Sequence, residues 1–171
     1  MPSHISVHIL QEPLAVGAAM EAVRDPGHGA IDLFVGVVRN LHVGKQVSGI
    51  TYDVHKPLAL CTMHAICEEG TTKWHGSRFY VAHYHGSLAV GEISVLIAVS
   101  TPHRADCFEA CRYVIEAIKT RLPVWKQEHY LDGKSAWLPG HSLNGSGASI
   151  DSRCCSCWWT LITHGAEQGY A

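Results

Sequence analysis

Residues 93–126, ISVLIAVSTPHRADCFEACRYVIEAIKTRLPVWK, contain the strand-helix-strand pattern that decides the fold. Ile93–Ser100 is nearly all apolar, which predicts a buried central strand. Thr101-Pro102 has the form of an N-cap followed by proline at the first helical position. The helix after it has apolar residues spaced by three and four, which predicts one buried face: Phe108, Cys111, Ile115, Ile118 and Leu122. Pro123 ends this helix, and Val124–Tyr130 is predicted to be a strand.

The residues on either side of this segment predict further strands and two more helices. Ala30–Val38 is expected to be a buried strand, in which Gly36 permits a close backbone approach. Helices are expected after Pro13, with Ala18 on the buried face, and from Pro57 to Trp74. Alternating apolar residues predict strands at residues 5–9, 47–54 and 79–83, and Asp132-Gly133 predicts a turn into Ser135–Leu138. Together these elements predict an α+β domain over residues 1–143.

Composition excludes several classes of protein. The chain has 171 residues, 47% hydrophobic and 16% charged, which excludes a disordered chain and fits one domain. Thirteen Lys and Arg stand against fifteen Asp and Glu, a net charge of −2, so no basic footprint for nucleic acid is present. Apolar runs are too short to span a membrane, and residues 1–10 do not resemble a signal peptide. We therefore expect a cytoplasmic protein.

Cysteine and histidine are unusually frequent, at 7 and 13 residues. The odd cysteine count without a secretion signal favours reduced thiols. Residues 144–171 begin with a Gly/Ser linker and continue as a Cys/Trp-rich C-terminal tail. Cys154, Cys155 and Cys157 lack the paired spacing of a zinc ribbon or finger, so we expect no metal site there.

Two local features suggest chemistry. Thr101-Pro102-His103-Arg104 joins a buried strand to a helix N-terminus, where an anion such as a phosphate is favoured, although Arg104 could instead be an ordinary solvated residue. Lys119 lies roughly 60° from the centre of the predicted apolar stripe and precedes Lys126 by seven residues. A lysine held near apolar walls and other cations can act as a base or nucleophile, whereas the plainer alternative is two surface lysines. Arg39 follows a predicted buried strand and is a weaker candidate.

Three ordered motifs resemble the catalytic subunit of molybdopterin synthase, the MoaE family. They are FVGVVR at 34–39, VSTPHR at 99–104 and KTRLPVWKQE at 119–128, and the resemblance spans about Ile5 to Leu143. It implies an α/β-hammerhead fold with an additional antiparallel β subdomain, and a homodimer. It also implies a small ubiquitin-like sulfur-carrier subunit that ends in a Gly-Gly thiocarboxylate. The implied reaction moves this sulfur to cyclic pyranopterin monophosphate to form the molybdopterin dithiolene, with no cofactor.

The resemblance also implies roles for individual residues. Lys119 is implied as the chief catalytic residue, and Lys126 is implied as a second catalytic residue that assists it. The implied substrate-binding residues are Phe34, Arg39, His103, Arg104 and His141. His141 stands where the family commonly has an arginine, and Tyr84 also replaces a family arginine.

A second hypothesis comes from another class of protein. A non-catalytic homodimeric module of the same fold would use its His/Cys-rich tail to bind a metal or a partner. Lys119 and Lys126, both present, favour the enzyme.

Overall fold

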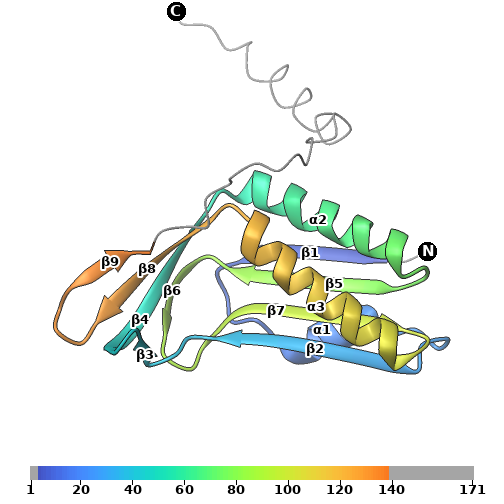
Figure 1. Cartoon of the computed structure of the whole chain (residues 1–171), viewed down its shortest axis with the longest axis horizontal. Helices are drawn as coiled ribbons and strands as arrows, with labels where there is room; N and C mark the ends of the chain where they lie inside the picture. Colours follow the sequence, from blue (N-terminus) through green and yellow to red (C-terminus); the bar gives the residue numbers. More distant parts are fainter. Residues whose placement is uncertain (1–3, 139–171) are drawn as a thin grey trace, which may run out of the picture.

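A four-stranded sheet forms the centre of the computed structural model, which describes residues 4–138. Its strand order is β1 (Ile5–Leu10), β5 (Arg78–Tyr84), β7 (Ile93–Thr101) and β2 (Ala30–Val37). β1 runs parallel to β5, and the other neighbours are antiparallel. Helices α2 (Lys56–Lys73) and α3 (Arg104–Arg121) cover one face, as Figure 1 shows. Helix α1 (Val16–Val23) packs on the other face.

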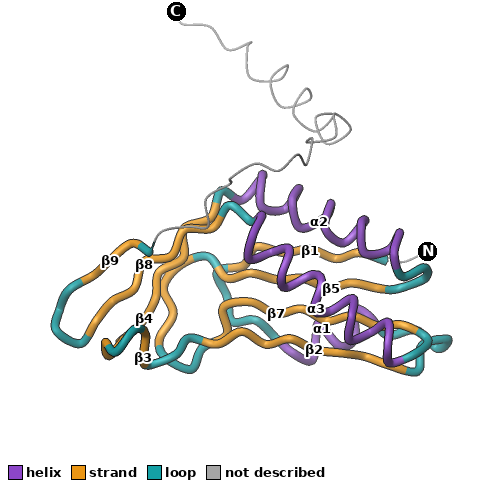
Figure 2. The backbone as a smooth tube through the Cα atoms, in the orientation of Figure 1, coloured by secondary structure: helices purple, strands orange, loops and turns teal. Residues whose placement is uncertain are grey.

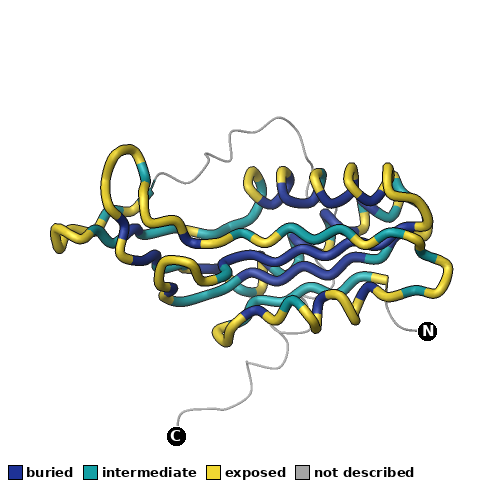
Figure 3. Tube along the Cα trace, turned by 90° about the horizontal axis from the view of Figure 1, so that it is seen from below, coloured by how far each residue is buried: buried dark blue, intermediate teal, exposed yellow. Residues whose placement is uncertain are grey.

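The apolar side chains form one core on each face of this sheet. Met63 and Ile66 of α2 and Val114 of α3 pack against alternate residues of β5 and β7, and Ala19 and Val23 of α1 pack against the intervening ones. β7 is buried from Ser94 to Thr101, which confirms it as the central strand (Figure 3). A strand covered on both faces needs apolar residues at consecutive positions, and the sequence of β7 supplies them.

A second sheet lies at one end of the first (Figure 2). Its order is β3 (Leu41–His42), β4 (Lys45–Val54), β8 (Val124–Tyr130) and β9 (Ser135–Trp137), with β6 (Gly86–Ala89) paired to β4. Its apolar residues form a separate small core around Val38, Val47, Ile50 and Leu88. This arrangement confirms the α+β class with an additional antiparallel subdomain.

The structure corrects several local expectations. Ala30–Val38 is not fully buried, because β2 is an edge strand and Val35 and Val37 are exposed. On α1, Ala19 is buried and Ala18 is exposed. Gly36 does allow a close approach, since a Cβ there would lie 2.5 Å from Cγ1 of Val95.

The largest correction concerns the buried face of α3. The helix begins at Arg104 with His103 as its N-cap, so Thr101 belongs to β7 and does not cap the helix. Phe108 is 60% exposed. The face that packs on the sheet uses smaller residues: Cys107, Ala110, Cys111, Val114, Ile115, Ala117 and Ile118. This face centres on the direction of Cys107, which places Lys119 roughly 120° from its centre rather than at its flank.

No helix within residues 4–138 combines the length and the apolarity needed to cross a membrane. The proposed boundary at residue 143 and the tail at 144–171 lie outside the described residues.

Candidate active site

Lys126 pairs with a buried carboxylate on the inner side of the second sheet. Its Nζ lies 3.2 Å from Oε1 of Glu128, whose side chain is only 2% exposed. The two side chains share one face of β8 because residues two apart in a strand point the same way. The other oxygen, Oε2, accepts hydrogen bonds from Nδ1 of His42 at 2.8 Å and from the Tyr130 hydroxyl at 3.1 Å. Every oxygen of this carboxylate therefore has a partner.

These neighbours stabilise the ionised form of Glu128. Burial acts to raise its pKa, but hydrogen bonds from Lys126, Tyr130 and His42, together with the positive charge of Lys126, outweigh burial and lower the pKa. The sequence suggested that a lysine near other cations could act as a base, whereas the structure places a carboxylate beside Lys126. Glu128 and His42 were missed as site residues. The Lys-x-Glu alternation in a strand is the signal that could have found Glu128.

Arg39 lies at the same end of the molecule. The chain leaves β2 through Val38, whose N–H donates to the Glu92 carbonyl and whose carbonyl accepts from the Gly91 N–H. Val38 is buried in the core of the second sheet, and Arg39, the next residue, is exposed. His42 follows three residues later and ties this loop to Glu128. One buried carboxylate thus connects the Arg39 loop to Lys126.

Lys119 also lies at this end, in the last turn of α3. Cys107, near the start of α3, donates to the carbonyl of Val99, which is paired with Asp32 of β2. Lys119 is twelve residues, about 18 Å, further along the helix, in the direction in which β2 runs toward Arg39. Its side chain is exposed. The structure therefore brings Lys119, Lys126 and Arg39 to one end of the fold.

His103 and Arg104 do not join them. Both are exposed and stand at the other end of α3, beside the Thr101 hydroxyl, which donates to the His103 carbonyl at 2.8 Å. Arg104 precedes Lys119 by fifteen residues, which is about 22 Å along a helix. Within one chain, the predicted anion site and the predicted lysine site are therefore separate.

The remaining predicted residues have different outcomes. Phe34 is half-buried on the α3 side of β2 and packs against the core there. Tyr84 is half-buried against the core of the second sheet. His141 lies outside the described residues, and its role stays a prediction.

Cysteine chemistry has little support in the described part of the chain. Cys67, Cys107 and Cys111 are buried free thiols, and burial raises the pKa of Cys67 and of Cys111 to about 12. A thiol with such a pKa is a poor nucleophile at neutral pH. Residues 4–138 contain no group of three His, Cys, Asp or Glu placed to hold a metal.

A cleft of about 310 Å³ lies at the C-terminal end of β8, four residues along the strand from Lys126. Its lining residues are Lys45, Gln46, Tyr130, Leu131 and Asp132. Nζ of Lys45 lies 5.1 Å from the centre of the Tyr130 ring, and the hydroxyl of Tyr130 reaches Glu128. Tyr130 therefore both lines the cleft and contacts the carboxylate that holds Lys126.

Comparisons with known proteins point to one family. The family described as MoaE protein matches residues 9–121. A molybdopterin synthase catalytic subunit from Synechococcus elongatus is 44% identical over 142 residues, which cover 82% of this chain and 86% of that protein. The subunit of the same name from Bos taurus is 40% identical over 131 residues, covering 77% and 69%. The crystal structure of molybdopterin synthase from Staphylococcus aureus superposes with a TM-score of 0.74 at 34% identity, covering 80% of this chain and 98% of that one.

Proposed function

This chain belongs to the MoaE family of molybdopterin synthase catalytic subunits, and we propose that it transfers sulfur at a site built around Lys119 and Lys126. The sulfur comes from the thiocarboxylated C-terminus of a small ubiquitin-like carrier subunit. The acceptor is cyclic pyranopterin monophosphate, which becomes the dithiolene of molybdopterin. The observation that carries the site assignment is the buried Glu128, which holds Lys126 and, through His42, the Arg39 loop.

Two copies of the chain are needed to complete the proposed site. The phosphate of the substrate needs cations, and His103 with Arg104 at a helix N-terminus would suit it. These two residues are about 22 Å along α3 from Lys119 of the same chain, too far for one small substrate to contact both. In the homodimer, His103 and Arg104 of one copy would therefore serve the lysines of the other.

The lysines would divide the chemistry. Sulfur transfer from a thiocarboxylate needs proton transfers and stabilisation of a tetrahedral oxyanion. Lys126, paired with Glu128, is placed to act as a fixed cation for the oxyanion. Lys119 forms no ion pair with the acidic residues that the structure describes, and it is the residue we assign as base or nucleophile. The sulfur arrives on the carrier, so the buried cysteines need not react.

The carrier's C-terminal tail would approach through the cleft beside Tyr130. A Gly-Gly terminus has no side chains and needs little room, and Lys45 in the lining of the cleft would attract its negative end. Cys67, Cys107 and Cys111 are free thiols, and on this basis we propose the cytoplasm as the place of action. The alternative of a non-catalytic binding module is not favoured, because the matching relatives are named catalytic subunits.

The decisive experiment is reconstitution. The purified full chain is mixed with a thiocarboxylated carrier and the cyclic pyranopterin, and molybdopterin is measured. Product formation that requires both the carrier's thiocarboxylate and Lys119 is the expected result. Product formation at the normal rate by a Lys119→Ala variant would remove the assignment of Lys119, and no product from the unmodified chain would remove the proposed function.

A further inference from the structure

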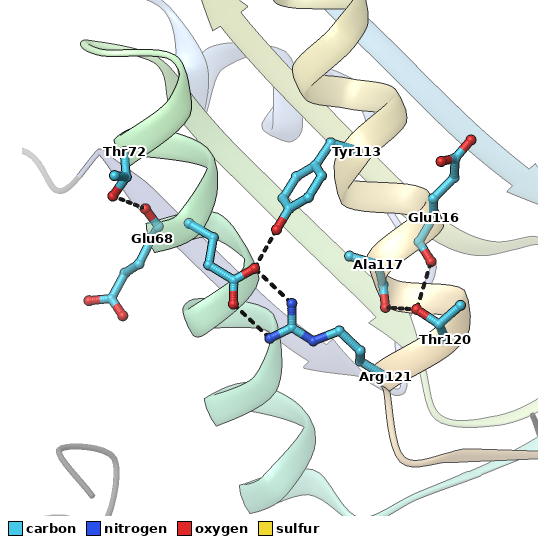
Figure 4. Close-up of polar contacts among 8 residues, drawn as sticks. Glu68, Thr72, Tyr113, Glu116, Ala117, Thr120 and Arg121 are labelled. Carbon is cyan, nitrogen blue, oxygen red and sulfur yellow. Dashed lines mark hydrogen bonds and ion pairs between the residues drawn. The ribbon is translucent and has the colours of Figure 1, made fainter. Parts of the chain in front are cut away.

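A charged cluster joins α2 to the last turn of α3, outside the residues assigned above. The guanidinium of Arg121 donates two hydrogen bonds to the carboxylate of Glu69, from Nη1 to Oε2 at 2.7 Å and from Nη2 to Oε1 at 2.8 Å. The hydroxyl of Tyr113 donates to the same carboxylate. Figure 4 shows Tyr113 and Arg121 reaching from α3 to this one carboxylate on α2.

The cluster is partly exposed to water, and its strength comes from its geometry. The side chains of Arg121 and Glu69 are 33% and 42% exposed. The hydrogen bonds from Arg121 are the main reason that the pKa of Glu69 is lowered. Burial, and then the hydrogen bond to Glu69, raise the pKa of Tyr113 to about 12. Nζ of Lys73 lies 3.7 Å from the centre of the Tyr113 ring, a cation–π contact. A bidentate pair of this kind fixes geometry better than a single ion pair.

The position of the cluster connects it to Lys119. Arg121 is the last residue of α3, Lys119 lies two residues before it, and β8 with Lys126 begins at Val124. The last turn of a helix has unpaired carbonyls and frays readily. Residues two apart in a helix point roughly 200° apart, so Arg121 faces α2 while Lys119 faces away from it. The cluster can therefore act on Lys119 only through the backbone of this turn.

We propose that Glu69 and Arg121, supported by Tyr113, are positioning residues for Lys119. By fixing the end of α3 to α2, they set where the Lys119 ammonium stands and where the chain enters β8. The proposal rests on the proposed function, because it assumes that Lys119 takes part in sulfur transfer. It adds a requirement outside the site: the reaction depends on an ion pair that does not contact substrate.

The test compares Glu69→Gln with Glu116→Gln. Glu116 is the matched control, since its ion pair with Arg112 is also on α3 but is exposed and lies within the one helix. A misplacement of about 1 Å can cost up to about 100-fold in rate. We expect Glu69→Gln to lower kcat about tenfold with KM within about twofold of wild type, and Glu116→Gln to leave both unchanged. Hydrogen exchange measured by mass spectrometry should become faster at residues 117–122 only in Glu69→Gln.

A double variant tests whether Glu69 and Arg121 act as one unit, and Tyr113→Phe provides a milder change. Arg121→Gln should match Glu69→Gln, and the double variant should cost no more than either, since both remove the same pair. If Glu69→Gln does not fold, Tyr113→Phe removes only the hydroxyl and should lower kcat about twofold to threefold with faster exchange in the same turn. If Lys119→Ala is inactive but the folded variants of Glu69 and Arg121 keep the wild-type kcat, the positioning role is overturned and the assignment of Lys119 stands. If Lys119→Ala keeps full activity, the assignment of Lys119 fails instead, and the exchange data still report whether the cluster holds the turn.

Discussion

Lys126 is paired with a carboxylate, Glu128, that is almost completely removed from water: the two groups are 3.2 Å apart, and the Glu128 side chain is 2% exposed. A carboxylate in such a place is stable only when its hydrogen bonds are made. The partners supplied by His42 and Tyr130 meet that condition. The lysine site is therefore part of a network that stabilises the second sheet as well as a candidate for chemistry.

Glu128→Gln should weaken both the fold and the reaction. Gln keeps the shape but leaves Lys126 without its counter-charge, so we expect the free energy of unfolding to fall by about 1–3 kcal/mol and turnover to fall with it. Glu21→Gln is the control, because its ion pair with Arg24 is 69% exposed on both sides and should change stability by less than about 0.5 kcal/mol. Equal effects in denaturant titrations of the two variants would contradict the role given to Glu128.

Gly70→Ala and Gly17→Ala should have opposite effects on stability. Both glycines are helical, but a Cβ at Gly70 would lie 2.7 Å from Cζ of Phe79, whereas a Cβ at Gly17 meets nothing within 4 Å. Overpacking a core costs about 1–3 kcal/mol, while alanine in an open helix position gains up to about 1 kcal/mol. Thermal unfolding of the two variants measures the difference. A Gly70→Ala protein as stable as wild type would show that α2 is not pressed against β5 as described.

Much of the fold could be predicted because helix ends, apolar runs and turn residues in the sequence all indicate the same elements. Pro123 ends α3, the apolar run of β7 lies at the centre of the sheet, and Asp132-Gly133 turns the chain between β8 and β9. The buried face of α3 could not be predicted from large apolar residues alone. Small residues such as Ala110 and Ala117 face the sheet, while Phe108 and Lys119 are exposed.

The site was harder to predict because its contacts join distant parts of the sequence. The bond between His42 and Glu128 spans 86 residues, and the pair Glu69–Arg121 spans 52. No local period indicates either contact. The structure places Arg39, Lys119 and Lys126 of the sequence motifs at one end of the fold, but the order of the motifs along the chain gave no sign that His103 and Arg104 stand at the other end.

His83 should make the fold sensitive to mild acid. The residue is 7% exposed, and its Nδ1 donates to the carbonyl of Tyr84 at 2.8 Å. Burial lowers its pKa below the ordinary 6.5, with the hydrogen bond to Tyr84 opposing this shift. The unfolded chain therefore takes up a proton below about pH 6.5 that the folded chain does not, so stability falls as pH decreases, by up to about 1.4 kcal/mol per pH unit.

The measurement for His83 is the free energy of unfolding between pH 7.5 and pH 5 for wild type and His83→Gln. The variant cannot titrate at this position, so its stability should fall less steeply below about pH 6.5. Parallel curves would show that His83 accepts a proton as readily in the fold as in the unfolded chain.

Lys119→Ala should remove most of the turnover and leave the fold intact. The side chain is exposed, so its loss makes no cavity, and a positioned proton transfer contributes about 10²–10⁴-fold to a rate. Lys119→Arg keeps the charge but holds its proton more firmly, and it should also be impaired. Steady-state kinetics decide the point, because near-normal turnover in the arginine variant would leave only an electrostatic role for Lys119.

The composite site predicts that two inactive proteins restore each other. Lys119→Ala and Arg104→Ala homodimers should each be strongly impaired, the first in catalysis and the second in substrate binding. A mixed dimer combines Arg104 of one copy with Lys119 of the other, so one of its two sites is intact and the other carries both substitutions. After subunit exchange of equal amounts, half of the dimers are mixed, and turnover should rise to about a quarter of the wild-type value.

A double variant carrying both substitutions, mixed with wild type, is the control: its mixed dimers have one defect in each site and should contribute almost nothing. If Lys119, Lys126, His103 and Arg104 of one site all came from the same chain, the first mixture would stay inactive. The control mixture would then keep half of the wild-type turnover.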